Sequence, residues 1–255
     1  MHQDSSSVVG LVGGTGGVGA STLACAVAAL AAEVGLSTLL VDLSPHGGGL
    51  DTVVGAAHLP GRRWPSREED LQRLRCSELP TVDGLRVLSH SRRVAPSRTL
   101  GGAAVEGVAR LARAHDVVVL DLPCPDHPRA LAWWHLASCP VLVVGTSPPQ
   151  VAGALAVRAL LPTARATVAR TSSGCGLHPG DVSDLLGLPL LARLDHDPSV
   201  ATALLEEVAP GRAEGAVRDA AAAVLALATG ARRGLTSGRR ADNGTGDEGR
   251  GGEVA

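Results

Sequence analysis

The sequence of 255 residues contains no lysine, no phenylalanine and no tyrosine, and tryptophan occurs only 3 times. Arginine therefore supplies every permanently basic side chain, and no lysine anywhere in the chain can contact a phosphate group. With so few aromatic side chains, the core must consist mainly of leucine, valine and alanine. The formal net charge of −2 gives no overall attraction to nucleic acid or to an anionic membrane surface, so we expect no nucleic-acid partner.

Cysteine pairs, a leader sequence and membrane-spanning runs are missing as well. None of the 5 cysteines forms a C-x-x-C pair, so we expect reduced thiols, with a zinc site as the alternative. The opening stretch MHQDSSS contains no basic segment of the kind that begins a secretion signal. The apolar runs 23–32 and 220–228 are too short to span a bilayer. We therefore expect a cytoplasmic protein without a membrane anchor of its own, which partners could recruit to a membrane or to a cell pole.

The most informative stretch that is present is VVGLVGGTGGVGAST, residues 8–22. Its apolar beginning predicts a buried strand, its glycines a tight loop over 13–19, and the small residues from Ala20 a long helix. Glycines let backbone N–H groups turn inward, and a helix N-terminus adds the positive end of its dipole. Strand, glycine loop and helix together predict a phosphate-binding loop.

Two motifs fit the same letters. The phosphate-loop pattern G-x-x-x-x-G-K-[ST] matches Gly14 to Ser21 except that Ala20 stands at the lysine position. The dinucleotide pattern G-x-G-x-x-G matches through Gly14, Gly16 and Gly19. The candidate nucleotide-binding residues are Gly14, Thr15, Gly16, Gly17, Val18, Gly19, Ala20, Ser21, Thr22 and Arg170.

The remaining chain alternates apolar strands with helical segments. Further strands are expected over 37–43, 85–89, 116–122, 141–146, 166–170 and 190–194. Helices are expected from 20 and over 67–76 in part, 98–114, 127–138, 150–161, 181–186, 198–208 and 213–229. This alternation predicts an α/β fold with a doubly wound, mostly parallel sheet flanked by helices. We expect a flexible N-terminus over 1–7, one domain over 8–230 and a disordered tail over 231–255.

Three polar side chains are expected at the carboxyl edge of that sheet, where ligands bind in such folds. Ser21 follows the lysine position and is a candidate Mg²⁺ ligand, with a helix cap as the alternative. Asp121 ends an apolar strand and fits a metal-holding aspartate, with a turn residue as the alternative. Asp42 ends another strand and could contact Mg²⁺, orient a water molecule in catalysis or bind a ribose hydroxyl, or act only in a turn.

Two clusters outside the loop are candidates for contacts with a partner. Trp133 and Trp134 point about 100° apart on a helix, so we expect one in the core and the other partly exposed. Arg62 and Arg63 beside Trp64 fit either a contact patch or a solvated face.

The segments TGGVGAST, LLVDLSPHGGGLD and DVVVLDLP resemble the nucleotide-site motifs of the MinD/ParA group of deviant-Walker ATPases. With GRRW at 61–64 and LRVLS at 85–89, the chain is also similar to actinobacterial CpaE-like proteins, also called septum site-determining or TadZ-like. The resemblance implies a P-loop NTPase fold, ATP or ADP with Mg²⁺, a homodimer, and partners in secretion, Flp-pilus or septum machinery. It further implies a role as a positioning, assembly or regulatory factor.

Three positions depart from that group. Thr15 stands where the group has its signature lysine, Ala20 replaces the loop lysine, and Ser44 replaces a second carboxylate that positions the attacking water. We therefore expect weak nucleotide binding and little or no hydrolysis, as in a pseudo-ATPase. Arg92 or Arg93 could supply charge instead, although both also fit a solvated loop. The other classes left open are an NAD(P)-dependent oxidoreductase and a scaffold without a ligand.

Overall fold

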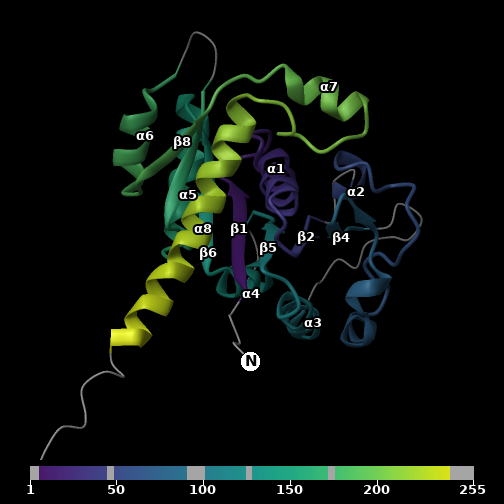
Figure 1. Cartoon of the computed structure of the whole chain (residues 1–255). Coiled ribbons are helices and arrows are strands. Elements are labelled where there is room, and N and C mark those ends of the chain that lie inside the picture. The colour runs from purple at the N-terminus through teal and green to yellow at the C-terminus, as the bar shows by residue number, and fades with distance from the viewer. Residues whose placement is uncertain (1–5, 45–48, 91–100, 125–127, 172–175, 242–255) are drawn as a thin grey trace, which may run out of the picture.

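A computed structural model describes residues 6–44, 49–90, 101–124, 128–171 and 176–241 of the protein. Its centre is an 8-stranded sheet in the order β3-β4-β2-β5-β1-β6-β7-β8 (Figure 1). The strands are β1 (Ser7–Gly13), β2 (Thr38–Asp42), β3 (Thr81–Val82), β4 (Leu85–Leu88), β5 (Val117–Asp121), β6 (Cys139–Gly145), β7 (Ala166–Arg170) and β8 (Leu190–Leu194).

Eight α-helices surround the sheet in the described part of the chain. They are α1 (Ala20–Glu33), α2 (Leu50–Val53), α3 (Gly102–Ala112), α4 (Pro128–Leu136), α5 (Pro148–Leu160), α6 (Pro179–Leu186), α7 (Ser199–Leu205) and α8 (Ala216–Ala241). Two 3₁₀ helices, η1 (Glu68–Arg73) and η2 (Cys76–Glu78), occupy the region where partial helix was expected.

The sheet is parallel except at one edge. Among the described strands only β3 and β4 pair antiparallel, and β1 lies between β5 and β6. Register pairs Asp42 with Asp121, so both aspartates stand at the carboxyl edge beside the end of β1. The prediction of a doubly wound, mostly parallel sheet is confirmed.

Alternate residues of the buried strands face two separate core layers. Val9 and Leu11 of β1 pack in the layer that includes α1 and α8, which lie side by side in Figure 1. Val8 and Val12 pack in the opposite layer, which includes residues of α3, α4, α5 and α6. Because both faces are covered, the strands read as continuous apolar runs rather than as alternating patterns.

The tryptophan prediction is wrong. Trp133 and Trp134 are 2% and 3% exposed, and both belong to the layer opposite α1. Trp133 packs edge-on against Trp64, with ring centroids 6.3 Å apart. The prediction assumed that α4 buries a single face, whereas side chains cover this short helix on more than one side.

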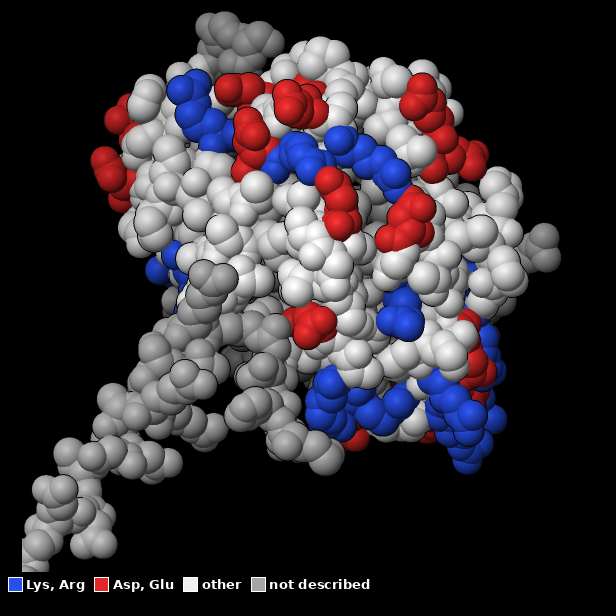
Figure 2. Space-filling view, viewed as in Figure 1, with Lys and Arg blue, Asp and Glu red and all other residues white. Residues whose placement is uncertain are grey.

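The C-terminal helix extends beyond the expected end of the domain. The backbone of α8 remains helical to Ala241, and residues 242–255 lie outside the described part, so the disordered tail stays a prediction there. Near its start, Arg218 forms an ion pair with Glu33 of α1, with a shortest distance of 2.7 Å. Figure 2 shows acidic and basic side chains interspersed across the upper part of this face, with basic side chains gathered at its lower edge. No helix in the described ranges has the length and apolar character that a bilayer crossing requires.

Candidate functional site

The glycine loop joins β1 to α1 and packs against α5. The Gly14 N–H donates to the Val143 carbonyl of β6 at 2.8 Å. A Cβ on Gly14 would lie 2.6 Å from the Cβ of Ala154, so only glycine allows this close approach to α5. Gly19 has φ 92°, which disfavours any other residue, and this turn leads directly into Ala20.

The beginning of α1 has no side-chain cap. Gly19 is the N-cap residue, and the helix starts one position later, at Ala20. The first N–H groups of a helix have no partner within the helix and carry the positive end of its dipole. The loop and the helix start therefore present donors suited to an anion.

A cleft of about 430 Å³ opens beside this helix start. It is lined by Gly13, Thr15, Gly16, Gly17, Val18, Gly19, Ala20, Ser21, Thr22, Ser44, Asp121, Leu122, Pro123 and Cys124. Most of the predicted loop residues therefore meet Asp121 in one cavity. Gly14 is absent from the lining because it is packed under the loop, and Asp42 is absent as well.

Ser21 and Asp121 face one another in this cleft. The Ser21 side chain is exposed, whereas Asp121 is 3% exposed and forms a hydrogen bond with Ser21. Burial raises the pKa of Asp121 from 3.8 to about 7; the hydrogen bond from Ser21 lowers it, and nearby Asp42 raises it slightly further. The removal of the carboxylate from water is the main cause of this shift.

Asp42 uses its carboxylate to hold its own loop. Its oxygens accept hydrogen bonds from the N–H groups of Ser44 and Leu50, each at 3.1 Å, and from the Ser89 hydroxyl at 3.1 Å. Its carbonyl accepts a 2.7 Å hydrogen bond from the Trp64 indole. These contacts assign Asp42 to organising the loop between β2 and α2, whatever else it contacts.

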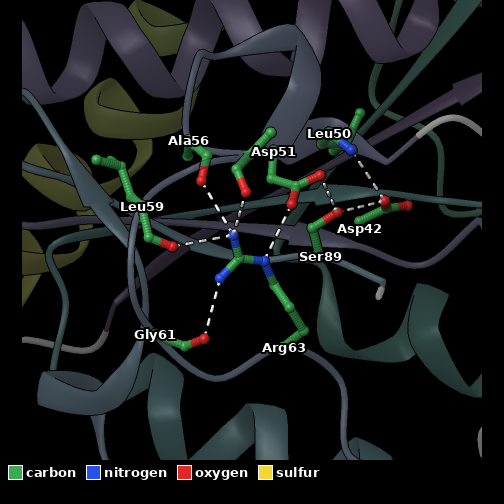
Figure 3. A network of polar contacts seen from close by, with 9 residues as sticks. Asp42, Leu50, Asp51, Ala56, Leu59, Gly61, Arg63 and Ser89 are labelled. Atoms are coloured by element: carbon green, nitrogen blue, oxygen red, sulfur yellow. Dashed lines mark hydrogen bonds and ion pairs between the residues drawn. The ribbon is translucent and has the colours of Figure 1, made fainter. Parts of the chain in front are cut away.

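A buried polar network continues from Asp42 (Figure 3). The Ser89 hydroxyl lies 3.3 Å from Asp51 Oδ1, and Arg63 Nε donates to Asp51 Oδ2 at 3.0 Å. The Arg63 and Asp51 side chains are only 14% and 4% exposed. The same guanidinium also donates to the carbonyls of Gly61, Ala56, Ala57 and Leu59.

Arg62 and Arg63 therefore differ in role, although they are neighbours in the sequence. Arg62 fits the solvated interpretation, because its side chain is 57% exposed and lies 3.5 Å from Glu78. Arg63 fits neither a contact patch nor a solvated face, and that interpretation is wrong for it, because five protein oxygens bind its guanidinium.

The positions that depart from the resemblance all line the cleft. Ala20 and Ser44 are both there. Thr15 lines it too, but its methyl group packs against Gly153 of α5, and its buried hydroxyl oxygen has no hydrogen-bond partner in the described structure. The cleft thus holds short side chains where the resemblance implies two lysines and a carboxylate.

Arg170 lies at the other side of the loop. It ends β7, and its Nη1 is 3.5 Å from the point that a Cβ on Gly19 would occupy. Arg92 and Arg93, the other candidate cations, lie outside the described residues.

Sequence reasoning missed the roles of Asp51, Arg63 and the Ser89 hydroxyl. Asp51 closes the GGGLD segment, and an aspartate two residues after a glycine run is the signal that could have pointed to it. No motif or spacing in the sequence predicts the buried role of Arg63, because four of its five oxygen partners are backbone carbonyls.

No family model matches the sequence. The chain is 37% identical over 209 residues to proteins of two Mycobacterium tuberculosis strains described as uncharacterized, a match that covers 78% of this chain. It spans only 57% of the length of those relatives.

Solved structures of other proteins share the fold. A ParA family ATPase from Chlorobium tepidum superposes with a TM-score of 0.71 at 15% identity, covering 89% of this chain and 98% of that one. MinD from Pyrococcus horikoshii in complex with Mg-ADP gives 0.69 at 19% identity, covering 88% and 95%. The chain therefore has the fold of the MinD and ParA ATPases.

Proposed function

We propose that this protein binds an adenine nucleotide with Mg²⁺ in the cleft at the glycine loop and hydrolyses ATP slowly or not at all. One observation carries the proposal. Ser21 and Asp121 meet beside an uncapped helix start in a cavity whose lysine positions are occupied by Ala20 and Thr15. Anion donors and metal ligands are thus present, while the two lysines that would stabilise a phosphoryl transition state are absent from the sequence.

The residues present fit Mg²⁺ that is shared with a phosphate. Mg²⁺ prefers oxygen ligands and is commonly held by one or two carboxylates, water and substrate phosphates. The Ser21 hydroxyl and the Asp121 carboxylate match that pattern. Within the described ranges no group of three or more His, Cys, Asp or Glu side chains could hold a metal ion alone, so binding of Mg²⁺ should depend on the nucleotide.

The fold and the resemblance support a role in positioning or assembly rather than in metabolism. We infer that the protein acts as a regulatory factor for secretion, Flp-pilus or septum machinery, and that it is a homodimer. Because the chain has no lysine that a second copy could provide, dimer formation should not require ATP. Sedimentation with and without Mg-ATP tests this, and a dimer that forms only with ATP contradicts it.

The NAD(P) alternative loses its main support at Asp42. In dinucleotide sites an acidic residue at this strand end binds the ribose hydroxyls. Here Ser44, Leu50 and Ser89 already occupy the carboxylate oxygens of Asp42.

Thermal unfolding with added ligand tests the proposal. A ligand that binds only the folded state at 100 times its Kd stabilises that state by about 2.7 kcal/mol. We expect Mg-ADP and Mg-ATP to raise the melting temperature and NADH not to do so. The variant Ser21→Ala removes a proposed Mg²⁺ ligand at an exposed position. Its melting temperature should lose the part of the nucleotide-induced shift that depends on Mg²⁺. An equal shift with NADH, or none with any nucleotide, would overturn the proposal.

A further inference from the structure

A second cavity, of about 300 Å³, opens beside the C-terminal half of α1. Its walls are mainly aliphatic, and we call it the α1 pocket after two residues of that helix; the aliphatic lining residues are Ala29, Ala32, Val54, Val82, Leu85 and Ala209. Its described lining residues include none of those that line the nucleotide cleft. Since an apolar cavity of about 150 Å³ can hold a benzene molecule, the α1 pocket has room for an aliphatic side chain.

Charged side chains surround this apolar interior. Arg212 lines the pocket and forms an ion pair with Asp83, and Glu33 forms another with Arg218. The Arg212 guanidinium is about half exposed, and it has enough donors to bind a second carboxylate beside that of Asp83. An apolar centre with a polar rim is the arrangement found at contacts between proteins.

Helix α7 carries the most exposed large apolar side chain in the described part of the chain. No residue of α7 is buried, and Figure 1 shows this helix at the margin of the molecule, on the same side as α1 and α2. Leu205, at the end of α7, is 87% exposed, and Leu204 is 44% exposed. Glu206 follows them, and its carboxylate forms no hydrogen bond or ion pair with a described residue.

Leu205 lies near the α1 pocket but does not fill it. Two residues later, the Glu207 carbonyl packs so closely on Gly55 that a Cβ there would clash with it, and Gly55 follows Val54 of the pocket wall. Glu207 has a φ of 54°, and this left-handed turn leads the chain into the wall segment that begins at Ala209. The Leu205 side chain is therefore in solvent beside an apolar pocket that its own chain leaves open.

A protruding leucine and an apolar pocket on neighbouring segments make a self-complementary surface, because a twofold axis brings each half of one copy to the other half of its partner. We propose that a second copy of this chain occupies the α1 pocket: Leu205 of each copy enters the pocket of the other, and Glu206 pairs with Arg212 across the interface. The inference rests on the proposed homodimer and names its interface. Because the pocket and the nucleotide cleft share no described lining residue, this dimer forms without nucleotide and leaves the cleft open.

Sedimentation of the full chain over a concentration series, without nucleotide, tests the inference. We expect the wild type to dimerise and Leu205→Asp to raise the dimer dissociation constant at least tenfold, because the twofold contact loses two buried leucines. Leu185→Asp is the matched control, since it adds the same charge at an exposed leucine of α6, a helix that packs in the opposite core layer. It should leave the dissociation constant unchanged.

Changes in the pocket test the same contact from its other half. Ala32→Leu fills the pocket and should weaken the dimer as Leu205→Asp does, whereas Ala32→Ser leaves the pocket open and should not. Glu206→Arg and Arg212→Glu should each weaken the dimer, and the two changes together should restore part of the loss. Melting temperatures show whether each variant is folded.

If folded Leu205→Asp or folded Ala32→Leu dimerises as the wild type does, the inference is overturned and the proposed homodimer stands. A wild type that stays monomeric overturns both. Neither result decides nucleotide binding, which the ligand-induced rise in melting temperature measures separately.

Discussion

The glycine-loop cleft differs from the network around Arg63 in exposure to solvent and in hydrogen bonding. The cleft is lined mainly by small side chains, is open to solvent at Gly16 and Gly17, and contains a Thr15 hydroxyl that has no hydrogen-bond partner among the described residues. The network is buried, and its polar atoms are extensively hydrogen-bonded. Each carboxylate of the sheet edge therefore performs one of two tasks.

The two aspartates at the sheet edge differ in role: one is available to bind a ligand, and the other stabilises its own loop. Asp121 lines the cleft, and Ser21 is its one side-chain hydrogen-bonding neighbour in the described part of the chain, so its carboxylate is available to a ligand. Asp42, its register partner, is occupied by three donors. Two aspartates that look equivalent in sequence thus have different chemistry, because the loop after β2 folds back onto only one of them.

The largest expected effect is on the support side. Arg63→Ala leaves Asp51 buried without its cation and four carbonyls without a donor, and loss of one partner of a buried ion pair destabilises by about 3–5 kcal/mol. Urea unfolding followed by tryptophan fluorescence measures this. Arg62→Ala, at the exposed neighbour, is the control and should change little. Similar losses in both variants would show that the buried network around Arg63 does not contribute to stability beyond what an exposed arginine contributes.

The second effect concerns the free carboxylate of the cleft. Since the folded-state pKa of Asp121 is about 7, above its unfolded value of 3.8, the folded protein holds the proton more tightly. Stability from this group is thus present below about pH 4 and is lost as the pH rises to 7. Asp121→Asn should remove that decline and stabilise the ligand-free protein at pH 8 by on the order of 2–4 kcal/mol.

Unfolding curves at several pH values between 5 and 8 check the slope. Asp184→Asn, at an exposed position of α6, controls for the loss of one acidic side chain. If the free energy of unfolding changes with pH in the same way in the wild type and in Asp121→Asn, the assignment is contradicted.

The third effect restores a cation to the cleft. Ala20→Lys should tighten ATP and ADP binding by about ten- to a hundredfold, because a charge-assisted hydrogen bond contributes roughly 1.5–3 kcal/mol. Turnover should not return, since Thr15 and Ser44 are unchanged. Ala20→Gln has similar length without charge, and calorimetry should give it the wild-type affinity. Equal tightening by glutamine would mean that length rather than charge was missing.

The smallest effect compares two buried indoles. The Trp64 N–H donates to the Asp42 carbonyl at 2.7 Å, whereas the buried Trp134 N–H has no partner in the described structure. Both tryptophan-to-phenylalanine changes remove the same volume. Trp64→Phe should therefore lower the free energy of unfolding by about 1–2 kcal/mol more than Trp134→Phe does in urea unfolding. Equal losses in the two variants would show that the indole hydrogen bond of Trp64 does not contribute to stability.

Backbone architecture was the predictable part of this protein. The strands expected over 166–170 and 190–194 are β7 and β8 with the same bounds, because short, mainly apolar runs between helical segments identify strands even at the partly exposed edge of the sheet. The glycine loop was equally predictable from the sequence, because its positive φ angles and its close approach to α5 allow few residues other than glycine.

Side-chain contacts across loops were not predictable. Whether Asp42 faces a ligand or its own backbone depends on how residues up to Leu50 fold back, and no periodicity encodes that. Arg63 is a similar case, because its partners are mainly carbonyls, which every residue possesses. Trp134 was misplaced because burial of α4 depends on neighbours from distant parts of the chain.

Steady-state phosphate release by the purified full chain at saturating Mg-ATP tests the central claim most directly. The cleft lacks both lysines and the second carboxylate, so the account predicts no release above that of an Asp121→Ala variant measured in parallel, even though nucleotide binds to the wild type. Sustained release by the wild-type protein that Asp121→Ala abolishes would contradict the account, and would show that another group, such as an arginine, supplies the missing charge.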